Sequence, residues 1–442
     1  MMGSEVNKER LKVLILASDC HPSMPSLPVV GYKYACAISE FADVTVVTHI
    51  RNKDAIRKIR PTHLDSKNLS FDFIDVRYIA KPIRKISTFL RGGNEVAWSI
   101  GMMSAYPSQV EFERQIWKKY KSLLKGGAYD VIHRITPMSP TMPSYMAGRS
   151  KQPFVVGPLN GNLDWPKEFS EEQKREKETA RKLRNLYKIL PFSKRTFKKS
   201  DSILAAFQHT VDDLPSFAMD KVVMFPEVGY DDTIFHAEKR RIPKQGAPMH
   251  FLFAGRLVPY KLPEVAIRAF VESEKLRNNH FLHIVGDGPE MSRLKHLVET
   301  NNAQDRVFFE GRLTQAEVAQ KMRETDVFVF PSIRELGAGV VVEAMACGMI
   351  SIVVDYGGPA GLIQSDRGVK VPLADREALV ASFRKEMEEL ADHSGSSEQI
   401  EKSRNAIEHA KNKYLWSRKS EMTIELYEYL LDSRKPKPQF FD

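Results

Sequence analysis

The sequence predicts an α/β protein that is built from two doubly wound parallel sheets. Short apolar runs alternate with longer amphipathic segments along the chain of 442 residues, which is the pattern of strands joined by helices in such sheets. This length exceeds one ordinary domain and fits two domains of roughly 200 residues each. Because 42% of the residues are hydrophobic, the chain has enough apolar material for two cores.

Each half of the chain contains a series of short apolar runs that read as buried strands. In the first half these runs lie at 13–17, 44–48, 71–75, 131–133, 154–156 and 203–206. In the second half they lie at 250–254, 282–285, 307–309, 327–330, 350–353 and 369–371. Two such sheets in tandem, without an internal sequence repeat, suggest two Rossmann-like domains that face one another.

We expect residues 1–236 to form the first domain and residues 237–415 the second. The segment 236–249 between them is charged, carries Pro243 and Gly246, and has no apolar period. A segment of this kind is typical of a linker.

Composition limits the compartment and the partners of the protein. The chain has 66 Lys and Arg against 56 Asp and Glu, a formal net charge of +10, which favours anionic partners. Its three cysteines, Cys20, Cys36 and Cys347, are too few and too scattered for a disulfide framework or a zinc site. The apolar segment 11–17 is too short for a signal peptide, and no run of about 18 apolar residues would span a membrane. We therefore expect a cytoplasmic protein.

Two glutamates, Glu335 and Glu343, flank a glycine-bearing turn after the expected strand at 327–330. We expect Glu335 on the loop and Glu343 about one turn into the following helix. A helix N-terminus after such a turn offers backbone N–H groups and a positive dipole end to a phosphate. Taken alone, the two acids are more simply an exposed loop carboxylate and a helix-start carboxylate.

Four ordered motifs in the second half resemble the retaining GT-B glycosyltransferases of group 1 (glycosyltransferase family 4). The resemblance is strong over about residues 250–365 and weaker elsewhere. Many relatives have Glu-x-Phe-Gly where this chain has Leu336-Gly337 after the first glutamate, so the donor sugar cannot be inferred. The motifs are 251–261 with Arg256 and Lys261, 284–289, 307–313, and Glu335 with Glu343.

The resemblance implies a GT-B fold in which a C-terminal helix within 416–442 crosses back to an N-terminal acceptor domain. It implies that Arg256 and Lys261 neutralise the leaving nucleoside diphosphate, although two solvated surface cations remain the alternative. Glu343 would bind the donor ribose, and Glu335 would lie near the transferred sugar. The implied donor-binding set is completed by Gly31, Gly311, Arg312 and the backbone amides of Gly339, Val340 and Val341.

Three residues of the first half are weaker candidates. The resemblance implies that His133, at a strand end, faces the donor sugar, although a lone histidine there is more often structural. Asn160 and Trp165 lie in a glycine-bearing loop after the strand at 154–156. We expect either acceptor carbohydrate recognition there or, equally, a structural turn with a buried tryptophan.

The segment 171–199 carries eleven Lys and Arg and four Glu, a net contribution of +7. A solvated helix face explains this charge as well as adhesion to an anionic membrane does. The membrane interpretation would place the protein peripherally at the inner face of the plasma membrane, next to a lipid-linked acceptor.

The sequence gives no sign of a metal site or of a dinucleotide cofactor, and we expect neither, nor a nucleic-acid partner. The function we expect is transfer of a hexosyl group from a nucleoside diphosphate sugar to a hydroxyl of a carbohydrate or lipid-linked acceptor. The resemblance implies retention of anomeric configuration without metal, in cell-surface polysaccharide or glycolipid synthesis. The alternatives are a nucleotide-sugar epimerase on the same fold and a non-catalytic basic surface-binding protein.

Overall fold

The computed structural model describes residues 10–59, 68–79, 98–175 and 188–441. Contacts divide the chain into two compact units, which are described separately below. The first unit consists of residues 1–162, 179–227 and 416–442, and the second of residues 163–178 and 228–415.

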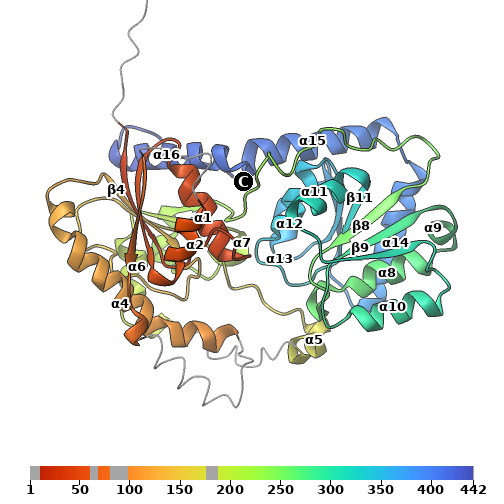
Figure 1. Ribbon diagram of the computed structural model, residues 1–442, viewed down its shortest axis with the longest axis horizontal. Helices are drawn as coiled ribbons and strands as arrows, with labels where there is room; N and C mark the ends of the chain where they lie inside the picture. Colours follow the sequence, from red (N-terminus) through yellow and green to blue (C-terminus); the bar gives the residue numbers. More distant parts are fainter. Residues whose placement is uncertain (1–9, 60–67, 80–97, 176–187, 442) are drawn as a thin grey trace, which may run out of the picture. The chain divides into compact units, whose positions relative to one another are not determined.

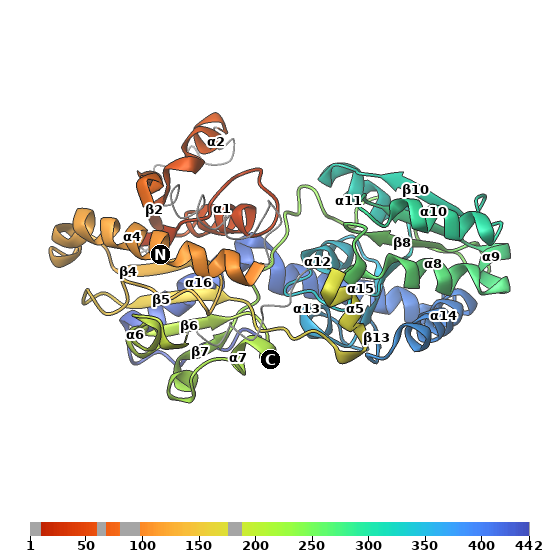
Figure 2. The ribbon, with the colours of Figure 1, turned by 90° about the horizontal axis from the view of Figure 1, so that it is seen from below.

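The first unit is a parallel sheet of seven strands in the order β3-β2-β1-β4-β5-β6-β7. Figure 2 shows β4, β5, β6 and β7 side by side in this order. The strands are β1 (Lys12–Ala17), β2 (Asp43–His49), β3 (Leu69–Ile74), β4 (Val131–Thr136), β5 (Phe154–Leu159), β6 (Ser202–Ala205) and β7 (Val222–Met224).

Helices cover both faces of this sheet, because alternate residues of each strand point to opposite faces. Val13 and Ile15 of β1 belong to a core that includes α1 and α16, whereas Leu14 and Leu16 belong to a core that includes α4 (Figure 1). The helices are α1 (Leu27–Ile38), α2 (Lys53–Lys58), α4 (Trp98–Lys125), α6 (Ser193–Lys199), α7 (Gln208–Val211) and α16 (Trp416–Leu431), with 3-10 turns η1 (Ile50–Asn52) and η4 (Ser216–Lys221).

The second unit is a parallel sheet of six strands in the order β10-β9-β8-β11-β12-β13. Its strands are β8 (His250–Ala254), β9 (Phe281–Val285), β10 (Val307–Gly311), β11 (Val327–Phe330), β12 (Ile350–Val354) and β13 (Gly368–Val371). Its helices are η2 (Lys167–Phe169), α5 (Ser170–Arg175), η5 (Pro259–Lys261), α8 (Pro263–Val271), α9 (Glu274–Asn279), α10 (Met291–Thr300), α11 (Gln315–Glu324), α12 (Gly339–Ala346), α13 (Gly357–Leu362), α14 (Arg376–Asp392) and α15 (Ser397–Tyr414).

The strand order of the second unit fixes where a ligand can bind. Strands β8 and β11 are neighbours, with Phe251 opposite Val327 in parallel register, and the strand order reverses between them. In open α/β sheets the crevice outside the carboxyl ends of the strands at such a switch point is the usual ligand site. A ligand is therefore expected at the loops that follow β8 and β11.

The predicted fold is confirmed in its main features. Every strand expected from the sequence is present and parallel, and α16 joins the first unit as expected. The sequence did not predict β7, which has only three residues. Among the described residues, no helix has the length and apolarity required to cross a bilayer.

The unit boundaries differ from the expected ones at two places. The second unit begins at Val228 rather than near residue 237, because Tyr230 pairs with Leu415 and its amide donates to the Tyr414 carbonyl at 3.0 Å. Residues 163–175, expected in the first domain, belong to the second unit.

Candidate functional site

The loops after β8 and β9 pack backbone against backbone. A Cβ added at Gly286, whose φ is +137°, would lie 1.9 Å from the Gly255 carbonyl oxygen, and one at Gly288 would lie 2.4 Å from the Leu257 carbonyl oxygen. The Leu257 amide donates to the Asp287 carbonyl at 2.9 Å. The glycines at 286 and 288 are thus required by close approach, and they fix the loop that carries Arg256.

Two cations follow β8 and differ in their surroundings. Arg256 is exposed, and its guanidinium donates to the Tyr260 hydroxyl at 2.8 Å. Lys261 ends η5 and is mostly buried. Its Nζ lies 5.0 Å from the centroid of the Phe330 ring, and a Cβ at Gly255 would lie 3.3 Å from its Cδ. The stem of Lys261 is therefore held by packing, whereas the Arg256 guanidinium is exposed and, among the described residues, is bonded only to the Tyr260 hydroxyl.

Lys261 forms an ion pair with Glu335, 74 residues later in the chain. The side chains of Lys261 and Glu335 are 11% and 16% exposed. The Ser332 hydroxyl lies 3.3 Å from the same carboxylate oxygen of Glu335, and the Ile333 amide donates to the Tyr260 carbonyl at 3.0 Å. The structure thus brings the two motifs after β8 and β11 into direct contact, as a site at the switch point requires.

Helix α12 begins beside this pair, at Gly339. Ala338 precedes it with a φ of 52°, in the left-handed region. The Val341 amide donates to the Ala338 carbonyl at 2.9 Å, so it is already engaged within the turn. The amides of Gly339 and Val340 belong to the first turn, which has no intrahelical acceptors. A phosphate cradle formed by the amides of Gly339, Val340 and Val341 stays a prediction.

The remaining donor-site candidates of the second unit are Glu343, which lies in α12, and Gly311 and Arg312, which lie at the end of β10. Glu343 is half-buried and lies within α12, as expected. Gly311 ends β10, and its carbonyl accepts from the Gly286 amide at 2.8 Å. Arg312 follows it and is exposed. β10 is the edge strand of the sheet, so these two residues are separated from the switch point by β9 and β8.

His133 is fully buried within the first unit. One ring nitrogen is hydrogen-bonded to the Tyr427 hydroxyl at 2.6 Å and the other to the Gly157 carbonyl at 2.8 Å. Burial lowers the pKa of His133 to about 4. These contacts occupy both ring nitrogens and favour the structural alternative, while a role toward the sugar remains a prediction.

Gly31 lies inside α1. A Cβ at this position would lie 2.5 Å from the Asp19 carbonyl oxygen and 2.9 Å from Cγ2 of Thr136. Close packing of α1 against the loop after β1 therefore explains the glycine. Whether the diphosphate also approaches it is a separate prediction.

The two acceptor candidates are both buried. The Asn160 amide donates to Glu227 at 2.6 Å, and burial raises the pKa of the Glu227 carboxyl. Trp165 belongs to the second unit, where the guanidinium carbon of Arg334 lies 4.9 Å from its ring centroid. This geometry favours the structural alternative for both residues.

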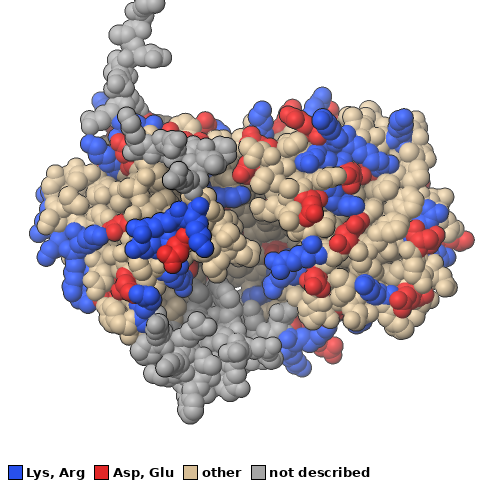
Figure 3. Space-filling model, viewed as in Figure 1, with Lys and Arg blue, Asp and Glu red and all other residues tan. Residues whose placement is uncertain are grey.

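The described residues of the basic segment 171–199 form ion pairs in both units. Its residues 176–187 lie outside the described part of the chain. Lys188 pairs with Asp213 at 3.2 Å, whereas Glu172 and Arg175 form ion pairs with the second unit. Figure 3 shows cationic and acidic side chains interspersed on the face drawn.

Sequence reasoning gave no role to Ser332 or Tyr260, and it did not predict that residues 163–175 pack within the second unit. Ser332 is the second residue after the end of β11 and is buried, and its place after the strand is the one signal that would have found it. Within the described ranges, no three His, Cys, Asp or Glu side chains gather as metal ligands would.

Residues 235–414 match the family described as Glycosyl transferases group 1. A D-inositol 3-phosphate glycosyltransferase of Streptomyces bingchenggensis is 29% identical over 187 residues, which cover 40% of this chain and 39% of that protein. A 2-deoxystreptamine glucosyltransferase of Streptomyces kanamyceticus is 29% identical over 169 residues, which cover 35% of this chain and 43% of that protein. The chain thus spans about two fifths of the length of the curated relatives it matches.

Solved structures resemble the chain over nearly its whole length. A glycosyltransferase from Rickettsia africae gives a TM-score of 0.60 at 13% identity, covering 96% of this chain and 99% of that one. The Anabaena protein HepE, crystallised with UDP, gives a TM-score of 0.57 at 14% identity, covering 94% and 99%. These similarities show that the fold is GT-B.

Proposed function

We propose that this chain, whose residues 235–414 belong to the group 1 glycosyl transferases, moves a hexosyl group from a nucleoside diphosphate sugar to an acceptor hydroxyl. The observation that carries the proposal is the contact of Lys261 with Glu335 beside the start of α12. A nucleoside diphosphate sugar presents an anionic diphosphate between two sets of hydroxyls. A cation, helix amides and a carboxylate at one switch point complement that arrangement.

In the proposed reaction, charge develops on the diphosphate as it leaves. Lys261, Arg256 and the amides of Gly339 and Val340 stabilise that charge electrostatically. The bond between the anomeric carbon and the diphosphate oxygen breaks, and the acceptor oxygen bonds to the same face of that carbon. The acceptor proton passes to a leaving phosphate oxygen, so the proposal needs neither a protein base nor a metal ion.

Glu335 has two tasks in this proposal. Without donor it is the counter-ion of Lys261 and holds the ammonium group at the site. With donor bound, Lys261 turns toward the diphosphate, and Glu335 accepts hydrogen bonds from hydroxyls of the transferred sugar. Glu343, within α12, binds the ribose hydroxyls.

The names of the relatives guide the choice of substrates. HepE has been crystallised with UDP-glucose, which makes this the first donor to test. The curated relatives are named for D-inositol 3-phosphate and 2-deoxystreptamine, so small cyclic polyols join carbohydrate and lipid-linked acceptors as candidates. A cytoplasmic location and peripheral membrane contact through the basic segment are part of the same proposal.

A thermal-shift screen against UDP-, GDP- and ADP-sugars tests donor binding. A donor at 100 times its dissociation constant stabilises the protein by about 2.7 kcal/mol. The best donor is then incubated with pooled acceptors, and products are identified by NMR. A glycoside supports the proposal, an epimerised donor supports an epimerase, and the absence of any shift supports a non-catalytic surface-binding protein.

A further inference from the structure

Residues 163–175, which we term the docking segment, leave the first unit and pack within the second. The docking segment comprises the loop at 163–166, η2 and α5. α5 packs against η5, the turn that carries Lys261. The docking segment thus contacts the candidate site, although it is far in sequence from the motifs that form that site.

The first part of the docking segment contacts the loops that hold Glu335. A Cβ at Gly357 would lie 2.7 Å from Cδ2 of Leu163, and the Tyr356 hydroxyl donates to the Asp164 carbonyl at 2.8 Å. Trp165 packs against Arg334, the residue before Glu335. The neighbouring Gly358 amide donates to the Glu335 carbonyl at 2.8 Å. The segment 163–165 therefore contacts Arg334, which precedes Glu335 in the chain, and residues 356–357, next to the glycine that bonds the Glu335 carbonyl.

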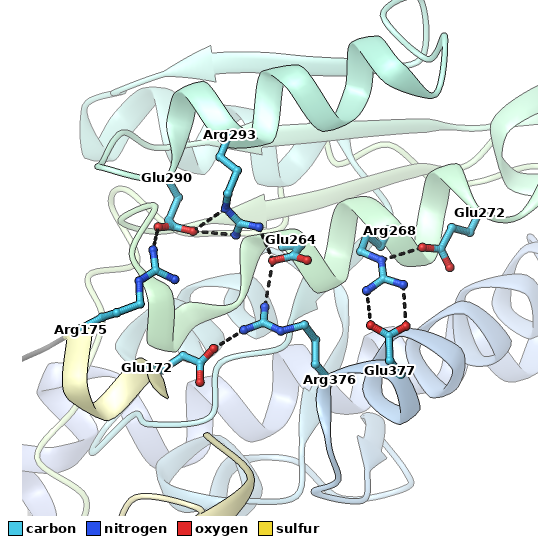
Figure 4. Close-up of polar contacts among 9 residues, drawn as sticks. All are labelled: Glu172, Arg175, Glu264, Arg268, Glu272, Glu290, Arg293, Arg376 and Glu377. Atoms are coloured by element: carbon cyan, nitrogen blue, oxygen red, sulfur yellow. Dashed lines mark hydrogen bonds and ion pairs between the residues drawn. The ribbon is translucent and has the colours of Figure 1, made fainter. Parts of the chain in front are cut away.

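The second part of the docking segment closes a chain of ion pairs whose charges alternate in sign (Figure 4). Arg293 joins Glu290 and Glu264, each at 2.6 Å, and Arg376 joins Glu264 at 2.9 Å. The three carboxylates are largely buried, with 4% to 13% of their side chains exposed. In order, the chain is Arg175, Glu290, Arg293, Glu264, Arg376 and Glu172.

This ion-pair chain brackets the backbone on which Lys261 lies. Glu264 is the second residue of α8, just after η5. The Glu290 amide donates to the Leu257 carbonyl at 3.1 Å. Both ends of the chain of charges belong to α5. Helix α5 therefore pairs directly with Glu290, just before α10, and with Arg376 at the start of α14, and it is linked through the other arginines to Glu264 of α8.

We propose that the docking segment is a positioning element for donor binding, with Trp165, Glu172 and Arg175 as positioning residues. It holds the Lys261 and Glu335 loops in the arrangement that the donor needs, without touching the donor. The inference rests on the proposed function and deepens it. If the docking segment detaches, only a fraction of molecules keeps a competent site, and the apparent dissociation constant rises by the inverse of that fraction.

The test variant is Glu172→Gln combined with Arg175→Gln, which neutralises both ends of the ion-pair chain. Its matched control is Glu377→Gln, which removes the bidentate pair of Glu377 with Arg268 at 2.5 and 2.7 Å elsewhere in the same unit (Figure 4). The conservative variant Arg175→Lys keeps the charge and should behave as wild type.

Hydrogen exchange without ligand is the first readout. In the double variant, peptides covering 256–262 and 333–338 should exchange about tenfold faster, whereas the control should leave them unchanged. The second readout is UDP binding and kinetics with UDP-glucose. The dissociation constant of UDP and the KM for the donor should both rise about tenfold, with kcat within about twofold of wild type, because a bound donor restores the loops.

The two readouts separate this inference from the proposed function. Unchanged exchange in a folded double variant overturns the docking segment's role, whatever the protein binds. Equal effects in the control also overturn it, because they indicate general destabilisation. Faster exchange in a protein whose wild type binds no nucleoside diphosphate supports the positioning of the loops and refutes the proposed donor.

Discussion

Lys261→Met removes the charge that the proposed site depends on and keeps most of the side chain. The lysine stem packs beside Gly255 and the Phe330 ring, and a methionine can fill the same space. The Glu335 carboxylate then loses its cation and retains its contact with the Ser332 hydroxyl. The substitution therefore separates loss of charge from loss of packing.

The expected cost in activity follows from the role of the charge. Removing one preorganised group that stabilises developing charge costs about 3–4 kcal/mol, and each 1.36 kcal/mol is about tenfold in rate. We expect kcat/KM to fall between about 10² and 10³-fold. The Lys261 and Glu335 side chains are 11% and 16% exposed, so breaking their pair should also lower the free energy of unfolding by about 2–4 kcal/mol.

A matched control separates the two effects. Lys321 pairs with Glu310 at 2.9 Å, with side chains 20% and 26% exposed, in the same unit. Lys321→Met should lower the free energy of unfolding by a similar order while keeping activity. The assay is release of nucleoside diphosphate from the donor, measured beside urea unfolding. Normal turnover in Lys261→Met, or equal loss of turnover in Lys321→Met, would refute the reasoning.

Glu343→Gln should mainly weaken nucleotide binding, because a ribose contact is made equally in the ground and transition states. Glu335→Gln should mainly lower turnover. Calorimetry of nucleotide binding beside initial rates tests both, and reversed phenotypes would show that the two roles are wrong. Burial lowers the pKa of His133 to about 4, below its unfolded value near 6.5. Between these two pH values the unfolded chain binds more protons than the folded one. The free energy of unfolding therefore falls as the pH falls through that window. From pH 7 to pH 5 the free energy of unfolding should fall by about 2 kcal/mol. Urea unfolding of His133→Asn should not show this fall, and a pH dependence equal to that of wild type would contradict this account. Changing the exposed Lys198 and Lys199 of α6 to Glu should weaken co-sedimentation of the protein with anionic liposomes at low salt. A wild-type protein that does not bind such liposomes would contradict the membrane proposal.

The loops after β8 and β11 were predictable because each follows an uninterrupted apolar strand. Gly255 and Arg256 come directly after β8, and Pro331 and Ser332 come directly after β11. The carboxyl ends of parallel strands lie at one edge of the sheet, so the sequence places both motifs there. The Lys261–Glu335 pair itself was not predictable, because it depends on how two irregular loops fold against each other.

The contacts that the sequence did not show are long-range. His133 is buried by Tyr427, which lies 294 residues later on α16. Glu172 finds its partner 204 residues away. A buried carboxylate and an exposed one look the same in a charged segment, because the difference depends on partners that local patterns do not encode. For the same reason Trp165 read equally well as a sugar platform or as a buried side chain.

The configuration of the first product tests the central claim most directly. The donor sugar that gives the largest thermal shift is incubated with the enzyme, and proton NMR follows the anomeric signal at early times. We expect release of the nucleoside diphosphate together with a product that has the same anomeric configuration as the donor, whether water or an added polyol accepts the sugar. A product of opposite configuration, an epimerised donor, or no release of nucleoside diphosphate would contradict the proposal that this chain is a retaining glycosyltransferase.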